Sequence, residues 1–180
     1  MHTNGISNNY IIEATKVEYN PKDFLYLYDK YTPNRYIDYR RNSFGLDISA
    51  ELGILYEPII QHYLNVFKDF VKIEYFTSNV GSGWQSYSLI RSKLERGLFI
   101  HKDNYRGASI TFPITFPQSV NWHTDNIGSD TWTYDYKPTI VFCNFGTQWH
   151  GVSPSNEPRL QFQFDCNVNW EDIPSLLEKI

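Results

Sequence analysis

Residues Leu98 to Asp103 read LFIHKD, and this stretch decides how the rest of the chain is interpreted. Phe99, His101 and Asp103 alternate with their neighbours, a period of two that is typical of an extended strand. Side chains two apart on a strand face the same side, so the His101 imidazole and the Asp103 carboxylate are expected to project together. A neutral nitrogen ligand beside an anionic oxygen ligand supplies two-thirds of a 2-His-1-carboxylate site, which holds Fe(II) with open coordination positions.

The composition is that of a globular protein. The chain has 180 residues, which most simply form one domain, with 41% hydrophobic and 20% charged residues. The mean hydropathy is -0.47, and no apolar run approaches the ~20 residues of a membrane span. The net charge of -4 and the pI near 5.7 give no basic field that could gather phosphates, which argues against nucleic-acid partners.

The N-terminal residues and the two cysteines favour a cytoplasmic protein. Residues 1–9 are polar and lack the cationic and apolar regions of a signal peptide. Cys143 and Cys166 have no zinc-binding spacing and lie in strand-like runs, so we expect buried, reduced thiols.

The chain divides into a weakly periodic first part, a strand-rich middle and a short end. We expect residues 1–75 to form helical or irregular support, 76–168 the core, and 169–180 a helix or tail. In the first part the patterns suggest a strand at Val17–Tyr19, a helix at Lys22–Tyr31, an extended piece at Tyr36–Arg41 and a helix within 49–70. Pro58 means that the last helix either begins near Glu57 or is kinked.

About eight strand-like runs separated by turn residues predict an all-β sandwich or barrel. These runs are 71–76, 85–93, 98–101, 108–116, 120–123, 131–136, 139–145 and 159–166.

A further histidine and a possible anion site follow downstream. His150 comes after the apolar strand 139–145 and a turn, at the entry to another strand. The strand RLQFQF, which begins at Arg159, places Arg159 with Gln161 and Gln163 on one face and its apolar residues on the other. The apolar face needs burial, so the polar face either lines an interior pocket or meets water. An arginine opposite a dicarboxylate would form a bidentate pair.

The order of these motifs resembles the Fe(II)/2-oxoglutarate-dependent oxygenases. The matching elements are His-x-Asp at 101–103, the strands 108–114 and 138–145, His150-Gly151-Val152, and Arg159. The resemblance covers roughly 84–166, and the chain resembles the compact branch of the family that includes aspartyl/asparaginyl hydroxylase-like and small phage or marine bacterial oxygenases. It implies a double-stranded β-helix, a jelly-roll or cupin-like barrel, with the N-terminal segment packed on it.

The resemblance also implies roles for individual residues. His101, Asp103 and His150 would bind the iron, and Arg159 would bind the distal carboxylate of 2-oxoglutarate. Many members have Arg-x-Ser, whereas this chain has Gln161 at the serine position, so Gln161 is a candidate donor. Tyr87 and Arg106 are further candidate cosubstrate contacts.

A second His-x-Asp triplet, His123-Thr124-Asp125, is a weaker candidate. In this fold about four strands separate the first triplet from the distal histidine. The distance from Asp103 to His150 is 150 - 103 = 47 residues, enough for four strands, whereas Asp125 to His150 is only 150 - 125 = 25 residues. His123 and Asp125 are therefore interpreted as pocket-edge or hairpin residues.

The expected function is that of an Fe(II)- and 2-oxoglutarate-dependent dioxygenase. It would use O2 to hydroxylate a small molecule or a protein side chain, with release of succinate and CO2. Four tryptophans are candidates for the pocket lining: Trp84, Trp122, Trp132 and Trp149. Two alternatives remain open at this point: a cupin-like metalloprotein acting as an isomerase or lyase, and a non-catalytic β-barrel binding module. The sequence indicates neither the substrate nor the oligomeric state.

Overall fold

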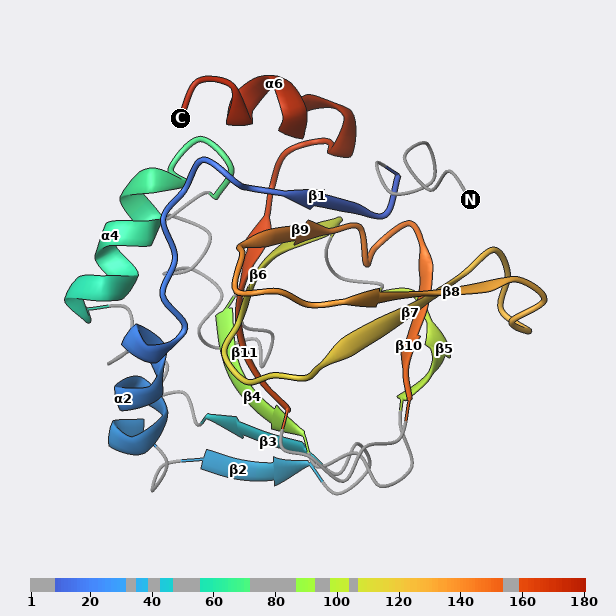
Figure 1. Cartoon of the computed structure of the whole chain (residues 1–180), viewed down its shortest axis with the longest axis horizontal. Helices are drawn as coiled ribbons and strands as arrows, with labels where there is room; N and C mark the ends of the chain where they lie inside the picture. The colour runs from blue at the N-terminus through green and yellow to red at the C-terminus, as the bar shows by residue number, and fades with distance from the viewer. Residues whose placement is uncertain are drawn as a thin grey trace.

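The computed structural model describes residues 9–31, 35–38, 43–46, 56–71, 87–92, 98–103, 107–153 and 159–180. Most of the strands in these ranges belong to a large antiparallel sheet with the order β1-β9-β6-β11-β4-β3-β2 (Figure 1). Its strands are β1 (Ile11–Glu13), β2 (Arg35–Asp38), β3 (Ser43–Leu46), β4 (Tyr87–Ser92), β6 (Ala108–Pro113), β9 (Val141–Cys143) and β11 (Arg159–Cys166).

A smaller antiparallel sheet has the order β5-β10-β7-β8. Its strands are β5 (Leu98–His101), β7 (Ser119–His123), β8 (Thr131–Asp135) and β10 (Trp149–Val152). From β5 onward the chain passes back and forth between the sheets, since β6, β9 and β11 lie in the large sheet. This winding makes the fold the double-stranded β-helix that the resemblance implies.

One hydrophobic core lies between the large sheet and the helices. Helices α2 (Lys22–Tyr31) and α4 (Pro58–Val66) cover the side of this sheet that faces away from the small sheet (Figure 1). Phe24 of α2 and Tyr63 of α4 pack with Phe112 of β6 and Phe162 of β11 in one buried cluster. Helix α4 begins at Pro58, where the missing N–H needs no partner, so the helix is not kinked there.

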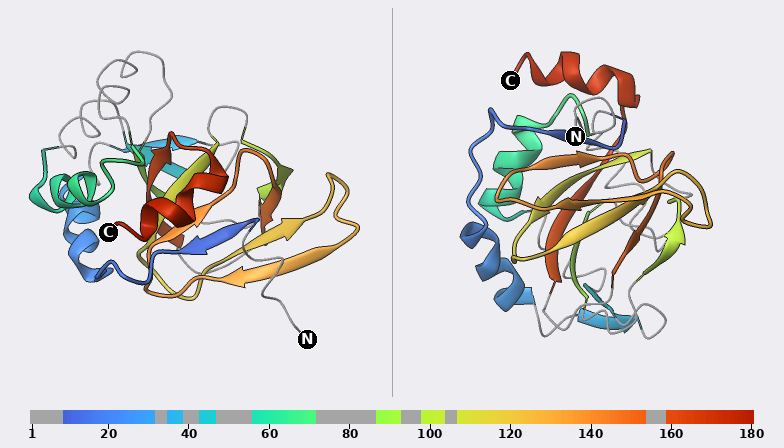
Figure 2. Two further views of the ribbon diagram at one scale, coloured as in Figure 1. Left: turned by 90° about the horizontal axis from the view of Figure 1, so that it is seen from above. Right: turned by 45° about the vertical axis from the view of Figure 1, so that its right-hand side comes forward.

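A second core lies between the two sheets. Val120 and Trp122 of β7 pack with Val141 and Cys143 of β9, and Ile11 of β1 joins them. The hairpin formed by β7 and β8 reaches beyond this core at one end of the molecule (Figure 2). Both cysteines, at positions 143 and 166, are buried and free of disulfides.

The first part of the chain differs from the prediction. Val17–Tyr19 is not a strand; it follows a turn, and Val17 and Tyr19 pack against the helix-side core. The strand in this region is β1, which pairs with β9 through Ile11↔Cys143 and Glu13↔Val141. A three-residue edge strand has too short a pattern to stand out in the sequence. The predicted strand at 71–76 and residues 39–41 of the extended piece fall largely outside the described ranges.

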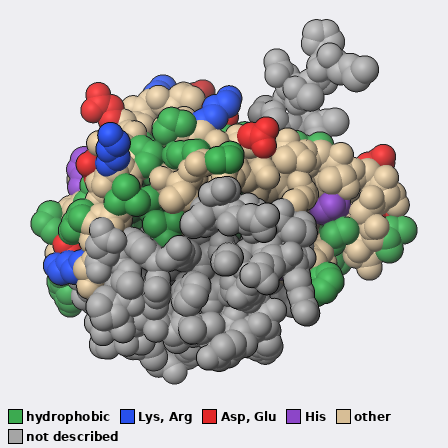
Figure 3. All heavy atoms as spheres, turned by 60° about the horizontal axis from the view of Figure 1, so that its bottom comes forward, with side chains coloured by type: hydrophobic (Ala, Val, Ile, Leu, Met, Phe, Trp, Pro, Cys, Tyr) green, Lys and Arg blue, Asp and Glu red, His purple; other side chains and the backbone are tan. Residues whose placement is uncertain are grey.

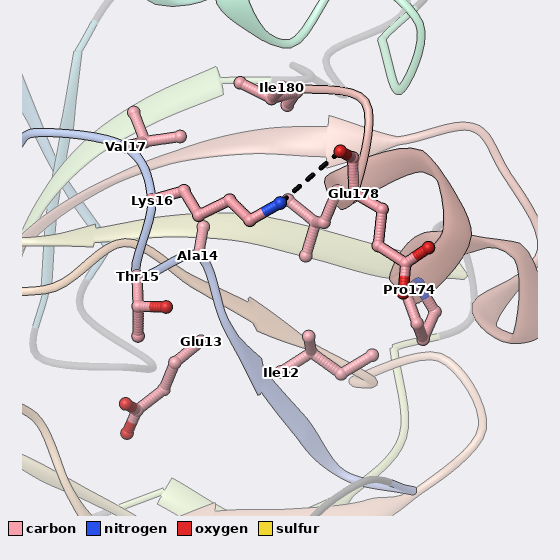
Figure 4. Close-up of a pocket in the computed structure, with 10 residues that line it drawn as sticks. Ile12, Glu13, Ala14, Thr15, Lys16, Val17, Pro174, Glu178 and Ile180 are labelled. Carbon is pink, nitrogen blue, oxygen red and sulfur yellow. Dashed lines mark hydrogen bonds between the residues drawn. The ribbon is translucent and has the colours of Figure 1, made fainter.

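The C-terminal residues form a short 3-10 turn, Trp170–Asp172, followed by helix α6 (Ile173–Leu177). Helix α6, β1 and the turn after β1 enclose a mostly apolar hollow of about 210 Å³. Across it, the Lys16 Nζ donates a hydrogen bond to the carbonyl oxygen of Glu178 at 3.4 Å (Figure 4). This contact ties the C-terminal helix to the N-terminal segment.

The exposed large hydrophobic side chains of the described residues are spread over several places, with Phe116 before β7 and Ile180 at the end of the chain. Leu25, Tyr26 and Tyr56 lie by the helices, and Phe99 and Ile127 lie on β5 and on the β7–β8 hairpin. Figure 3 shows hydrophobic side chains from the left edge to the upper middle of the coloured surface, and a further set at the right beside a histidine. Within the described ranges, no helix is long and apolar enough to cross a membrane.

Candidate metal centre

Strand pairing brings the two distant histidines together. In the small sheet β10 lies between β5 and β7, and His150 of β10 is the direct partner of His101 on β5. Directly paired residues point to the same face, and the two imidazole centroids are 4.3 Å apart. Asp103 follows β5 by two residues. His150 is buried, whereas His101 and Asp103 are half-buried, so the group lies at the edge of the barrel interior.

The three side chains converge through specific atoms. Asp103 Oδ1 lies 3.4 Å from His101 Nε2 and 3.9 Å from His150 Nε2. One ligand atom from each of the three residues lies within 4.8 Å of the other two, a spacing that could hold a metal ion. The structure therefore brings together the three residues that the sequence predicts as iron ligands.

Backbone carbonyl groups orient both imidazoles. His101 Nδ1 lies 2.7 Å from the carbonyl oxygen of Phe99, and His150 Nδ1 lies 3.2 Å from that of Gln148. A carbonyl oxygen only accepts hydrogen bonds, so each Nδ1 donates to its carbonyl group and each Nε2, which faces Asp103, is the nitrogen left to bind a metal. This arrangement of a second hydrogen bond behind each ligand is typical of metal-binding histidines. Two neutral imidazoles and a carboxylate fit a divalent transition metal such as Fe(II).

The second triplet serves a local structural role. Asp125 Oδ1 accepts hydrogen bonds from the backbone N–H groups of Ile127 and Ser129. A hydrogen bond from the Ser129 side chain, followed by these backbone bonds, holds the pKa of the Asp125 carboxyl below its usual range. The His123 Nδ1 lies 2.8 Å from the Thr131 Oγ1 across the hairpin, and burial lowers the pKa of this imidazole despite the nearby Asp125. Alternation along β7 puts His123 on the face opposite Trp122, whose ring approaches His150.

Gln161 lies on the inner face of the large sheet. Its neighbours Leu160 and Phe162 point into the helix-side core, so alternation directs Gln161 between the two sheets. Its side chain is 8% exposed, and its Oε1 has no hydrogen-bond partner among the described residues. Buried polar atoms are usually hydrogen-bonded, and a polar ligand bound in the barrel would supply the partner that Gln161 Oε1 lacks.

For two other predicted cosubstrate contacts, Arg159 and Tyr87, the structure describes the position of the backbone in the sheet. Arg159 begins β11 and is paired with Ser92, while Tyr87 is paired with Phe164 at the far end of the same strand. Five residues of strand separate these two levels, about 16–17 Å. Arg106 and Trp84 lie outside the described residues.

No family model and no curated protein matches the chain. Among solved structures, the chain is similar to a prolyl-4-hydroxylase from Pseudomonas putida, with 13% identity and a TM-score of 0.49 over 87% of this chain and 90% of that one. It is also similar to an oxidoreductase of the 2OG-Fe(II) oxygenase family from Burkholderia pseudomallei. Here the identity is 12% and the TM-score 0.46, over 81% of this chain and 78% of that one.

Sequence reasoning missed the residue that connects the ligands. Phe145 accepts a hydrogen bond from the Asp103 N–H through its carbonyl oxygen, and its ring lies 4.4 Å from the His150 ring. The sequence offers only one hint, a phenylalanine at the end of an apolar strand shortly before the histidine. On the other face of the small sheet, the Lys102 ammonium lies 4.9 Å from the centre of the Trp149 ring.

Proposed function

We propose that this protein is an Fe(II)- and 2-oxoglutarate-dependent dioxygenase that hydroxylates a C–H bond of a small molecule or a protein side chain. Succinate and CO2 would be the products of the cosubstrate. The proposal rests on the convergence of His101 Nε2, His150 Nε2 and Asp103 Oδ1 at one point. A metal held by these three atoms keeps coordination positions for a chelating cosubstrate and for O2.

In this proposal the protein residues bind and orient, while the bound iron supplies the oxidative chemistry. The carbonyl groups of Phe99 and Gln148 hold the imidazole rings in the orientation that ligation needs. The Asp103 carboxylate gives the site its negative charge, which a divalent cation offsets. The packed inner core formed by Trp122 and its neighbours excludes water from one side of the centre.

Arg159 and Gln161 are proposed to bind the cosubstrate. In the resembling family, an arginine at the start of such a strand holds the distal carboxylate, and Arg159 is the first residue of β11, which supports this role. The buried Gln161 Oε1, which has no hydrogen-bond partner among the described residues, supports a polar ligand in the barrel interior. Rotating this amide by half a turn would present its NH2 group to a carboxylate, since the two orientations have nearly the same shape.

The test is anaerobic addition of Fe(II) and then 2-oxoglutarate, with the visible charge-transfer band of the chelate as the readout. We expect the band in wild type, its loss in Asp103→Ala, and much weaker binding of 2-oxoglutarate in Arg159→Ala. His62→Ala is the matched control, because His62 lies on α4, where its ring contacts Tyr63. This variant should retain the band.

Each other result has a distinct meaning. A band that persists in Asp103→Ala would show that the ligand set is wrong. Iron binding without a response to 2-oxoglutarate would favour a cupin-like metalloprotein acting as an isomerase or lyase. Absence of iron binding in wild type would leave a β-barrel binding module.

A further inference from the structure

A row of oxidisable aromatic side chains leads away from the candidate metal centre through the inner core. The Trp122 ring lies 5.6 Å from the His150 ring, and the Trp132 ring stacks on Trp122 at 6.2 Å with an interplanar angle of 25°. Trp122 and Trp132 are also direct partners in the pairing of β7 with β8. Tyr134 follows Trp132 by two residues on the same face of β8. We call Trp122, Trp132 and Tyr134 the aromatic row.

The two indoles of the aromatic row are unusual in their hydrogen bonding. The Nε1 atoms of Trp122 and Trp132 are both buried, and neither has a hydrogen-bond partner among the described residues. Buried polar groups are nearly always paired, and a redox role is one reason for an exception. An indole that loses an electron becomes a strong acid, but no described residue is in place to take its proton. The positive charge therefore stays mobile and can pass to the next ring.

The far end of the row has the proton acceptor that the indoles lack. The Tyr134 hydroxyl donates a hydrogen bond of 2.8 Å to Glu13 Oε1 on β1. Burial, together with the Glu13 carboxylate, raises the pKa of the Tyr134 phenol, so the hydroxyl keeps its proton at neutral pH. Oxidation makes a phenol strongly acidic, and this proton can then move directly to Glu13.

Tyr10 is the competing end point, and its surroundings argue against it. Its ring packs edge-on against both indoles, with centroid distances of 5.5 Å to Trp122 and 5.3 Å to Trp132. Its hydroxyl, however, has no hydrogen-bond acceptor in the part of the chain that the structure describes. A tyrosine gives up an electron far more readily when a base takes its proton, which favours Tyr134.

We propose that the aromatic row carries one electron from Tyr134 to an oxidised iron centre at His101, Asp103 and His150 when no substrate is bound. This inference rests on the proposed function, because reaction of the iron with O2 and 2-oxoglutarate supplies the oxidant. Tyr134 loses one electron, and its hydroxyl proton moves to the Glu13 carboxylate. Trp132 and Trp122 each pass on one electron and return to their starting state. The iron centre is reduced by one electron, and a neutral tyrosyl radical remains at Tyr134.

The row would protect the metal ligands. An oxidised iron centre without substrate attacks groups close to it, and the described groups at or beside the ligand atoms include the imidazoles and the Phe145 ring, which lies 4.4 Å from the His150 ring. Moving the oxidising equivalent to Tyr134 takes it out of the first layer of side chains around the metal.

The experiment is freeze-quench electron paramagnetic resonance of the iron-loaded protein with 2-oxoglutarate and O2 but no substrate. Parallel samples receive hydrogen peroxide instead of 2-oxoglutarate and O2, so that the row can be tested even if 2-oxoglutarate does not bind. Wild type should give a tyrosyl radical signal. Tyr134→Phe should abolish it, and Trp122→Phe should lower it several-fold, because phenylalanine is much harder to oxidise.

Trp149→Phe is the matched control. It removes a tryptophan next to His150 in sequence but on the other face of β10, and it should keep the wild-type signal. Peptide mass spectrometry adds a second readout. Oxygen addition within 98–103 and 144–152 should increase in Trp122→Phe and Tyr134→Phe relative to wild type and to the control.

Several outcomes would overturn the proposal. A tyrosyl signal that persists in Tyr134→Phe would move the end point elsewhere, and equal signals in Trp122→Phe and wild type would exclude the route. Absence of any radical in wild type that binds iron and consumes the oxidant would reject the row while leaving the proposed function intact. Absence of iron binding in the anaerobic titration would reject the proposed function itself, and the row with it. Tyr134→Phe retains the aromatic ring, so the test does not depend on Trp122→Phe folding.

Discussion

The main-chain N–H of Asp103 donates a hydrogen bond of 2.9 Å to the carbonyl oxygen of Phe145. The ring of the same phenylalanine lies 4.4 Å from His150 and stacks on Trp122 at 5.4 Å with an interplanar angle of 20°. The backbone of Phe145 thus holds the main chain at Asp103, and its side chain supports the His150 imidazole. The relative position of Asp103 and His150 depends on this contact.

Replacing Phe145 by alanine should weaken both folding and metal binding. Phe145 is 4% exposed, and loss of a buried phenylalanine ring costs about 3–5 kcal/mol of unfolding free energy. Removal of the ring also frees the His150 imidazole to tilt, so the affinity for Co(II), used as an air-stable probe, should fall. Urea unfolding and anaerobic Co(II) titration are the measurements.

Phe142→Ala is the control for this prediction. Phe142 is fully buried in the helix-side core, so its loss should destabilise the protein by a similar amount and leave the Co(II) affinity unchanged. Equal affinities in the two variants would show that Phe145 has no special role at the centre.

Gly128 should tolerate no side chain without strain. It has a φ of 75°, and a Cβ there would lie 3.0 Å from the Cδ1 of Ile100. The left-handed backbone costs a residue with a side chain about 1–2 kcal/mol, so Gly128→Ala should lower the unfolding free energy by about this amount. Gly107→Ala is the control, because a Cβ at Gly107 would meet nothing within 4 Å. Similar midpoints of urea unfolding for both variants would contradict the prediction.

The stability of the hairpin should depend on pH through His123. Burial lowers the pKa of this imidazole below its ordinary value of 6.5, although the Asp125 carboxylate opposes the shift. The unfolded chain then binds the proton more tightly than the folded one, so stability falls as the pH drops from 6.5 toward the folded pKa. Below the folded pKa both states are protonated, and this contribution no longer changes.

His123→Gln should remove that part of the pH dependence. Urea unfolding between pH 8 and pH 5 measures it, as the difference between wild type and variant at each pH. An equally steep loss of stability on acidification in the variant and in wild type would show that other groups cause this pH dependence.

Removal of metal should destabilise the folded protein. A ligand that binds only the native state at about 100 times its dissociation constant adds about 2.7 kcal/mol of stability. Co(II) should therefore raise the melting temperature of wild type, and a chelator should reverse the shift. Asp103→Ala should show neither effect. A shift of wild-type size in this variant would place the bound metal elsewhere.

The strand at 159–166 shows what the sequence makes predictable. Its alternating residues face two different environments, the helix-side core for Phe162 and Phe164 and the barrel interior for Gln161 and Gln163. A period of two in the sequence predicts this difference directly, because alternate residues of a strand face opposite sides. The spacing argument also selects the first His-x-Asp triplet, and the pairing of β5 with β10 places His101 opposite His150.

The parts that escaped prediction depend on contacts between distant segments. Strand β1 has only three residues and exists because Ile11 to Glu13 pair with β9, some 130 positions later. The bond from Tyr134 to Glu13 and the support of His150 by Phe145 likewise involve groups whose local sequence is ordinary. Local patterns report which face a residue occupies, whereas these contacts are decided by which strands become neighbours.

The separation of the ligands along the chain bears on how the protein is made. His101 and Asp103 leave the ribosome before His150, with 150 - 103 = 47 residues between Asp103 and His150. At a synthesis rate of about 5–20 residues per second, this interval is roughly 2–9 seconds. A nascent chain that has exposed only the first two ligands has two-thirds of a site, and β10 must insert between β5 and β7 before the third arrives. Under the proposed function, binding of a metal by all three residues waits until the small sheet is complete, which would keep a redox-active metal away from an unfinished chain.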